Sequence, residues 1–384
     1  MTRQVLLLNS DKPEVNDILA RRPDVRVRVI TRKVYADLYH GLDVAYVDGF
    51  DDLTQVERAA YELTAGGPVD HVIAATEKSV VPAGLVRSLL GVPGLGFDQS
   101  LWAAHKRAMK DRLRDAGLPV TPHAQAASLD EVERAAGATG WPVVVKPVFG
   151  AAAKATYRVE SPADLAARHR AGEFADLAAR RLPVQVERLV RFSDEYHCDG
   201  VVHRGEVARA AVSRYLVSPM RIPKDLNSGC LIDQSTPFAR AVLDLHRRVV
   251  AVLGLTAGVT HLEVFRTDDG PVIGEVAVRP GGLGISRSWW HAFGVDLWEE
   301  FVRVSLDEDP TRPDRPAREE IVGRTQLPVF PGLRERAAAL PGVIEVRTPE
   351  ESGTGYLEAH YTAPDETAAA ELNTRLQALA VPGA

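Results

Sequence analysis

The chain has 384 residues, of which 45% are hydrophobic and 26% are charged, and its formal net charge is −6. This length exceeds one ordinary core and predicts two or three domains of a globular protein. Basic residues are not gathered into a patch along the sequence, which argues against a nucleic-acid-binding protein. The two cysteines, Cys198 and Cys230, argue against a disulfide framework and suit a reducing compartment.

The apolar run near the start, residues 5–8, is too short for a signal peptide or a membrane span. We therefore expect a cytoplasmic protein without a membrane partner.

Residues 1–97 alternate between short apolar strands and helices. The strands are predicted at 5–8, 25–30, 44–47 and 71–75, and the helices at 13–20, 53–63 and 80–90. Such alternation predicts a parallel sheet covered on both faces, here a Rossmann-like N-terminal α/β domain. No G-x-G-x-x-G follows the first strand, so a dinucleotide site is not supported.

The remainder divides into three segments, 98–190, 191–322 and 323–384. One amphipathic helix is predicted over 98–115, followed by a strand at 142–147 and a small-residue loop at 148–156. Later strands are predicted at 183–190, 195–203, 206–217, 324–329, 343–347 and 355–361, and helices at 237–253, 284–304 and 365–379. Residues 218–236 and 307–320 look irregular, the second because it is rich in proline and charge.

Residues 258–282 predict a hairpin around Asp269-Gly270. If Thr267 pairs with Pro271, Glu263 lies directly opposite Glu275. Facing carboxylates repel each other unless a cation lies between them, and oxygen ligands suit Mg²⁺ held together with substrate phosphates. The alternative is a solvated hairpin with two surface glutamates.

Other charged residues surround this hairpin in the sequence. Arg279 and the turn with Gly281 and Gly282 offer anion recognition on the same side. Lys146 ends an apolar strand just before the small-residue loop, a combination that cradles phosphates, although a lysine snorkelling from a strand end is the ordinary alternative. Lys106 alone reads as a surface lysine.

A further strand ends in Glu187 and leads to Glu195. It could supply backbone hydrogen bonds to a purine and a carboxylate to a ribose, although an ordinary hairpin with charged ends fits as well. His197, Asp199 and His203 share one strand face, but no further ligand is spaced to complete a transition-metal site.

In their order and spacing, these stretches resemble the ATP-grasp superfamily, and within it the carboxylate–amine ligases, from about residue 70 to 305. The resemblance implies an ATP-grasp fold with a small lid subdomain and a larger antiparallel-sheet subdomain. It assigns the metal pair to Glu263 and Glu275, and the nucleotide-binding residues to Lys106, Lys146, Glu187, Leu189, Val190 and Glu195. Lys154 is a further hypothesis, a phosphate contact outside the family pattern.

The implied reaction is attack of a carboxylate on the γ-phosphate of ATP, followed by attack of an amine on the acyl-phosphate. Positioning and charge stabilisation supply the catalysis, with Lys146 and Arg279 as catalytic residues. The implied cofactors are ATP and Mg²⁺, with Mn²⁺ as a substitute, and the implied assembly is a homodimer. Arg214, Arg221, Gly281 and Gly282 are the expected substrate contacts.

The chain departs from the family pattern at two places. Ala277 stands where the family often has a metal-binding Asn, and the phosphate loop is rich in alanine and carries Lys154. A biotin-dependent carboxylase subunit and a non-catalytic nucleotide-binding protein are the alternative functions.

Overall fold

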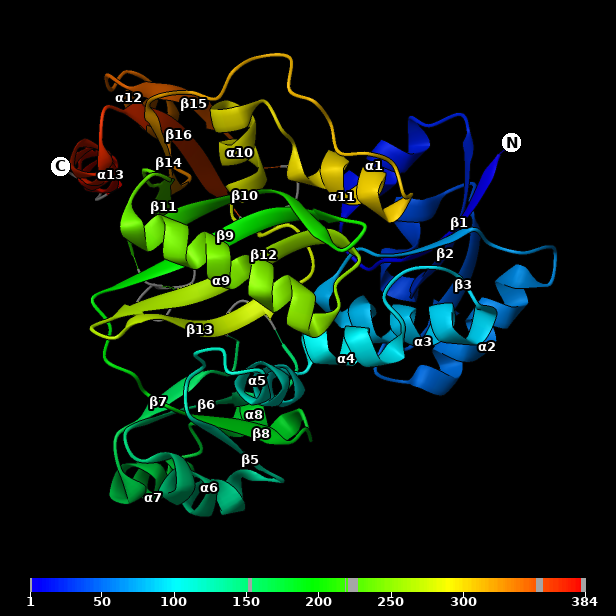
Figure 1. The fold of residues 1–384 in the computed structure, drawn as a ribbon, viewed down its shortest axis with the longest axis horizontal. Coiled ribbons are helices and arrows are strands. Elements are labelled where there is room, and N and C mark those ends of the chain that lie inside the picture. Colours follow the sequence, from blue (N-terminus) through cyan, green and yellow to red (C-terminus); the bar gives the residue numbers. More distant parts are fainter. Residues whose placement is uncertain (1, 151–153, 218, 220–226, 350–354, 381–384) are drawn as a thin grey trace.

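A computed structural model describes residues 2–150, 154–217, 219, 227–349 and 355–380. They form three sheets, with the four-stranded N-terminal sheet to one side of a large eight-stranded sheet and a small four-stranded sheet below it (Figure 1). No helix of the described residues is both long and apolar enough to cross a membrane.

The N-terminal domain has the predicted parallel sheet, in the order β3-β2-β1-β4. Its strands are β1 (Arg3–Leu8), β2 (Val25–Arg32), β3 (Asp43–Val47) and β4 (His71–Ala74), and its helices are α1 (Pro13–Ala20), α2 (Leu53–Thr64) and α3 (Val80–Leu90). Residues 5–8 are buried completely because helices cover both faces. A short 3-10 turn, η2 (Glu77–Ser79), follows β4 and enters the candidate site.

The small sheet forms the predicted lid subdomain, with antiparallel strands in the order β5-β8-β6-β7. The strands are β5 (His123–Ala126), β6 (Val143–Pro147), β7 (Tyr157–Val159) and β8 (Val184–Arg188), packed with α6 (Val132–Thr139), α7 (Pro162–Arg170) and α8 (Ala175–Ala179). Residues 119–120 lead into this sheet and bind the large one, where the Ile273 N–H donates to the Pro119 carbonyl at 2.8 Å.

The large sheet is antiparallel, in the order β13-β12-β9-β10-β11-β14-β16-β15. Its strands are β9 (Asp194–His203), β10 (Glu206–Tyr215), β11 (Ser228–Leu231), β12 (Ala257–Thr267), β13 (Gly270–Ala277), β14 (Ile321–Pro328), β15 (Val343–Arg347) and β16 (Tyr356–Ala363). Strand β11 lies in the stretch expected to be irregular and pairs with β14. The C-terminal segment therefore continues this sheet.

Helices cover both faces of the large sheet. Side chains alternate along β9, so Val202 packs with α9 (Pro237–Leu253) and Val201 packs with α10 (Ile285–Phe293) and α11 (Leu297–Ser305). Helices α12 (Leu333–Ala338) and α13 (Glu366–Leu379) pack on the C-terminal strands.

Two helices predicted as continuous are broken. Residues 98–115 form α4 (Phe97–Ala104) and α5 (Lys106–Asp115), because His105 adopts extended backbone and its Nδ1 accepts from the Ala108 N–H at 3.2 Å. Residues 284–304 divide at Gly294, which has a positive φ of 70° and ends α10.

Candidate active site

The β12–β13 hairpin brings Glu263 and Glu275 opposite each other, as predicted, but by a different register. Thr267 pairs with Gly270 instead of Pro271, a shift of one residue that alone would misalign the glutamates. A bulge beside Val264 leaves Gly274 without a partner and restores the pairing. The expected register at the turn was therefore wrong, whereas the predicted pairing of Glu263 with Glu275 is present in the structure.

Lysines from two other elements converge on this pair. Lys106, the first residue of α5, places its Nζ 2.8 Å from Glu275 Oε1 and donates to the Gly150 carbonyl at 2.7 Å. Lys146 from β6 lies 3.6 Å from Glu275 Oε2 and 3.1 Å from Glu187 Oε1. The break at His105 thus starts a new helix whose first side chain reaches the hairpin and the loop after β6.

A third lysine, Lys110, belongs to the same cluster and was not predicted. Its side chain is fully buried, and its Nζ donates to Thr121 Oγ1 at 2.7 Å and lies 3.4 Å from Glu187 Oε2. Burial lowers the pKa of Lys110 to about 8, against the opposing effect of Glu187. The sequence carried a signal, because Lys106, Met109, Lys110 and Leu113 have the spacing of a buried helical stripe.

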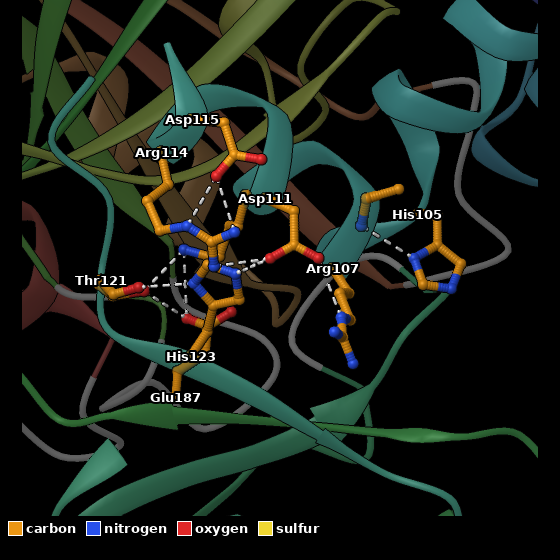
Figure 2. A network of polar contacts seen from close by, with 10 residues as sticks. His105, Arg107, Asp111, Arg114, Asp115, Thr121, His123 and Glu187 are labelled. Atoms are coloured by element: carbon orange, nitrogen blue, oxygen red, sulfur yellow. Dashed lines mark hydrogen bonds and ion pairs between the residues drawn. The ribbon is translucent and has the colours of Figure 1, made fainter. Parts of the chain in front are cut away.

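Glu187 is the common partner of these lysines. Burial alone raises its pKa, but Lys110 and Lys146 outweigh burial and hold the pKa of Glu187 at about 2. Thr121 also donates to Glu187 Oε2 at 3.1 Å, and both side chains lie beside α5 (Figure 2). The Glu187 side chain thus links the lid sheet to α5.

The segment after β8 was expected to contact a nucleotide. The Leu189 N–H donates to the Pro142 carbonyl at 2.8 Å, so this N–H is already used within the lid. Val190 follows, half-buried, outside any strand. Glu195 is buried on β9 and pairs in register with Phe265, next to Glu263 on β12. The chain therefore leads from the lid directly to the neighbourhood of the metal pair.

The three residues considered for a transition-metal site, His197, Asp199 and His203, do not come together in the structure. His203 lies away from the site, with its Nε2 3.2 Å from Asp307 Oδ1. Its place beside Asp199 is taken by His261 of β12, whose Nδ1 lies 2.8 Å from Asp199 Oδ1, while His197 Nδ1 lies 2.6 Å from Asp199 Oδ2. Burial lowers the pKa of His261, but Asp199 outweighs it and raises this pKa to about 9.

This arrangement places a hydrogen-bonded histidine beside Glu263. Asp199 uses one carboxylate oxygen on each imidazole, and a pKa of about 9 makes His261 cationic at neutral pH. His261 Nε2 lies 3.8 Å from Glu263 Oε1. Burial raises the pKa of Glu263, but His261 outweighs burial and lowers it. The ligand atoms of His197, Asp199 and His261 lie within 4.8 Å of one another, so these three residues could themselves hold a metal ion.

Arg279 and its turn lie beside His261. Arg279 Nε donates to Glu77 Oε2 of η2 at 3.2 Å, and its Nη1 donates to the Pro280 carbonyl at 2.9 Å. A Cβ on Gly281 would meet His261 Nδ1 at 2.9 Å, so only glycine allows this close approach. Gly282 has open space around it. Ala277 is buried opposite His261 and offers no ligand.

Two of the expected contacts, Arg214 and Lys154, form no ion pair with Glu263 or Glu275 in the described part of the chain. Arg214 points to the α9 face of the sheet, in register with Tyr196, and its Nη2 lies 2.7 Å from Asp194 Oδ1. Lys154 is exposed in the turn before β7. Arg221 lies outside the described residues.

The donor set suits a magnesium ion bound with phosphates. Glu263 and Glu275 present carboxylate oxygens from adjacent strands, and both side chains are partly exposed, at 32% and 22%. Lys106 and Lys146 neutralise Glu275. Such lysines can transfer their contacts to phosphate oxygens when a nucleotide brings a metal ion to the two glutamates.

Comparison with known proteins identifies the family. A model of the ATP-grasp domain matches residues 111–286. An L-arginine-specific L-amino acid ligase of Bacillus subtilis is 32% identical over 359 residues, covering 89% of this chain and 86% of the relative. A D-alanine–D-alanine ligase of Mycobacterium sp. (strain KMS) is 31% identical over 233 residues, covering 54% of this chain and 60% of the relative.

The fold agrees with these matches. The structure of an L-amino acid ligase from Bacillus licheniformis superposes with a TM-score of 0.73 at 17% identity, covering 98% of this chain and 97% of that one. The chain therefore belongs to the ATP-grasp family and is an ATP-dependent, ADP-forming ligase that joins a carboxylate to an amine.

Proposed function

We propose that this ligase joins two amino acids into a dipeptide, and that its acyl donor is activated between the Glu263/Glu275 pair and Arg279. The convergence of the two glutamates with Lys106 and Lys146 is the observation that carries the proposal. The relative named an L-arginine-specific L-amino acid ligase supports amino acids as substrates and makes L-arginine the first acid to test.

The charged groups have distinct roles in this proposal. Lys106 and Lys146 approach Glu275 from α5 and β6, and they hold the phosphate oxygens of ATP. Arg279 stabilises the transferring phosphate and then the oxyanion formed when the amine attacks. Glu195 holds the ribose, and the segment around Val190 lies against the purine. These residues position reactants and charge, and none is a covalent nucleophile.

Magnesium is held by Glu263 and Glu275 in this proposal, with Mn²⁺ as a substitute. When bound, the ion neutralises charge on the phosphates of ATP. The support from His261 keeps Glu263 ionised and therefore ready to coordinate. Ala277 supplies no third ligand, so phosphate and water oxygens complete the coordination.

The test measures ADP and phosphate release with Mg-ATP and pooled L-amino acids, with dipeptides detected by mass. The wild-type enzyme should require an amino acid for release, and Glu275→Gln should abolish it. Asp269→Asn is a matched control because Asp269 is exposed at the tip of the same hairpin. Release that persists in the Glu275→Gln variant would exclude the proposed metal pair.

A further inference from the structure

A buried cluster of two histidines and an aspartate lies beside the metal pair. His197 and Asp199 stand on β9, and His261 faces Asp199 in register from β12. The ligand atoms of these three side chains lie within 4.8 Å of one another, close enough to surround one ion. The sequence offered only the two β9 residues together with His203, and the fold supplies His261 as the missing ligand.

Both imidazoles turn the same ring nitrogen toward one carboxylate. His197 Nδ1 lies 2.6 Å from Asp199 Oδ2, and His261 Nδ1 lies 2.8 Å from Asp199 Oδ1. Two imidazole nitrogens and a carboxylate oxygen form a ligand set that suits zinc and related transition metals. Ligand atoms around a tetrahedral ion are roughly 3.3 Å apart, so an ion requires these two contacts to widen by only about 0.5–0.7 Å.

The outer ring nitrogens are placed as those of metal-bound histidines are. A metal-binding histidine usually donates its second N–H to a carboxylate, a carbonyl or a water molecule. His261 Nε2 lies 3.3 Å from Tyr215 Oη and 3.8 Å from Glu263 Oε1. His197 Nε2 has no partner in the described part of the chain, and His197 lines a cavity of about 10 Å³, which has room for one water.

The cluster is enclosed by protein. His197 and Asp199 are 1% and 0% exposed, and His261 is 9% exposed. The turn that follows Arg279 lies directly on the cluster, because a Cβ on Gly281 would meet His261 Nδ1 at 2.9 Å and Asp199 Oδ1 at 3.2 Å. An ion bound here therefore joins β9, β12 and this turn.

We propose that His197, Asp199 and His261 bind one transition-metal ion of the zinc class, distinct from the magnesium proposed at Glu263 and Glu275. The three side chains and one water molecule hold the ion, which fixes the turn above it on the sheet. Each Nδ1 releases its proton to solvent as the ion binds, and each Nε2 keeps its own. Nitrogen ligands separate the two sites, because magnesium prefers oxygen. The inference is independent of the proposed function, since it requires neither ATP nor an amino acid.

Metal content tests the proposal. Untagged enzyme, purified without chelators from zinc-supplemented medium, should contain one zinc ion per chain by elemental mass spectrometry. Asp199→Asn keeps the shape but removes the shared carboxylate, and it should lose the zinc. His203→Asn is the matched control, because His203 lies on the same strand with its Nε2 3.2 Å from Asp307, and it should retain the zinc. Glu275→Gln should also retain the zinc while it loses magnesium-dependent turnover.

Cobalt and zinc binding keep the test decisive if Asp199→Asn folds poorly. Wild-type enzyme stripped with dipicolinate and loaded with Co²⁺ should show the intense visible bands of four-coordinate cobalt, which Zn²⁺ removes and excess Mg²⁺ does not. Folded Asp199→Asn should bind zinc more weakly by more than roughly 10- to 100-fold, the effect of losing only an outer partner of a metal ligand.

Three results would overturn the inference. Wild-type enzyme that contains no zinc and shows no cobalt bands would mean that hydrogen bonds alone hold the cluster. Zinc that stays in folded Asp199→Asn would place the ion elsewhere, and zinc lost in Glu275→Gln would place it at the magnesium pair. Absence of ADP release with every amino acid would overturn the proposed function and leave this inference standing.

Discussion

Glu77 and Arg279 are 202 residues apart in the chain and are joined by a hydrogen bond of 3.2 Å from Arg279 Nε to Glu77 Oε2. Glu77 lies in the turn after β4 of the N-terminal domain, whereas Arg279 follows the metal hairpin. Both side chains are mostly shielded, at 14% and 18% exposed. The N-terminal domain therefore contributes to the site by fixing the direction of one arginine.

Replacing Glu77 tests this relationship. Glu77→Gln keeps the shape but removes the charge, so Arg279 should lose its fixed orientation, and kcat should fall roughly 10- to 100-fold, the scale of a misplaced catalytic group. The KM for ATP should be unchanged because Lys106 and Lys146 are untouched. The neighbouring Lys78 is exposed, so Lys78→Gln should behave as wild-type. An unaltered kcat in Glu77→Gln would mean that the Pro280 carbonyl alone orients Arg279.

Lys110 should contribute to the stability of the fold. Lys110→Met removes a fully buried cation from Glu187, so we expect a loss of about 3 kcal/mol in the free energy of unfolding. Arg107 on the same helix pairs with Asp111 at 2.9 Å but is 47% exposed, so Arg107→Ala should cost less than about 1 kcal/mol. Urea denaturation of both variants measures the difference. Equal losses would show that Lys110 contributes packing and not a charge pair.

The sequence predicted those parts of the site that depend on strand alternation. Glu263 and Glu275 stand opposite each other as predicted, but only because the bulge at Gly274 offsets the one-residue error in the predicted turn register. The parallel N-terminal sheet was likewise predictable from alternating strands and helices.

Other features depend on contacts distant in sequence, and these were missed. The helical spacing of Lys110 with Met109 and Leu113 was a signal of burial, but its partner Glu187 lies on the lid sheet, 77 residues later. Glu77 had no local pattern that linked it to Arg279. Strand β11 is only four residues long and pairs with β14. Its Ser228 pairs with Thr325, which lies 97 residues later in the chain. Tertiary pairing of this kind overrides local propensity.

Gly274 provides a test of the bulge that aligns the metal pair. A Cβ at this position would lie 3.0 Å from Phe265 Cε2, so Gly274→Ala must displace Phe265 or the bulge. We expect a loss of about 1 kcal/mol in stability from overpacking and a higher Mg²⁺ concentration for half-maximal activity. In contrast, Gly137 in α6 has open space, and Gly137→Ala should be neutral or stabilising by up to about 1 kcal/mol. An unchanged Mg²⁺ requirement in Gly274→Ala would show that the bulge tolerates a side chain.

The pH dependence of stability should reveal Glu345. Its carboxylate accepts two hydrogen bonds of 2.7 Å from Arg287, and His291 Nε2 lies 2.8 Å away. Burial raises the pKa of Glu345, but Arg287 and His291 outweigh burial and lower this pKa to about 2. Because the folded-state pKa lies below the ordinary value of 4.5, the ionised group stabilises the fold above about pH 4.5. This contribution is lost as the pH falls from there toward about 2.

Glu345→Gln should therefore lower the Tm at neutral pH, and the difference from wild-type should shrink below about pH 4.5. The expected loss in the free energy of unfolding is about 1–2 kcal/mol. This is less than the full pKa shift implies, because Glu345 is 25% exposed and solvent screens the pair. Glu320 lies 3.6 Å from Arg318 in an exposed pair, so Glu320→Gln should change the free energy of unfolding by less than about 0.5 kcal/mol at every pH. Calorimetry from pH 7 down to about 3.5 measures both variants. A Tm difference for Glu345→Gln that stays constant across this range would show that Glu345 acts through its shape, because a charge pair must weaken as the carboxylate takes up its proton.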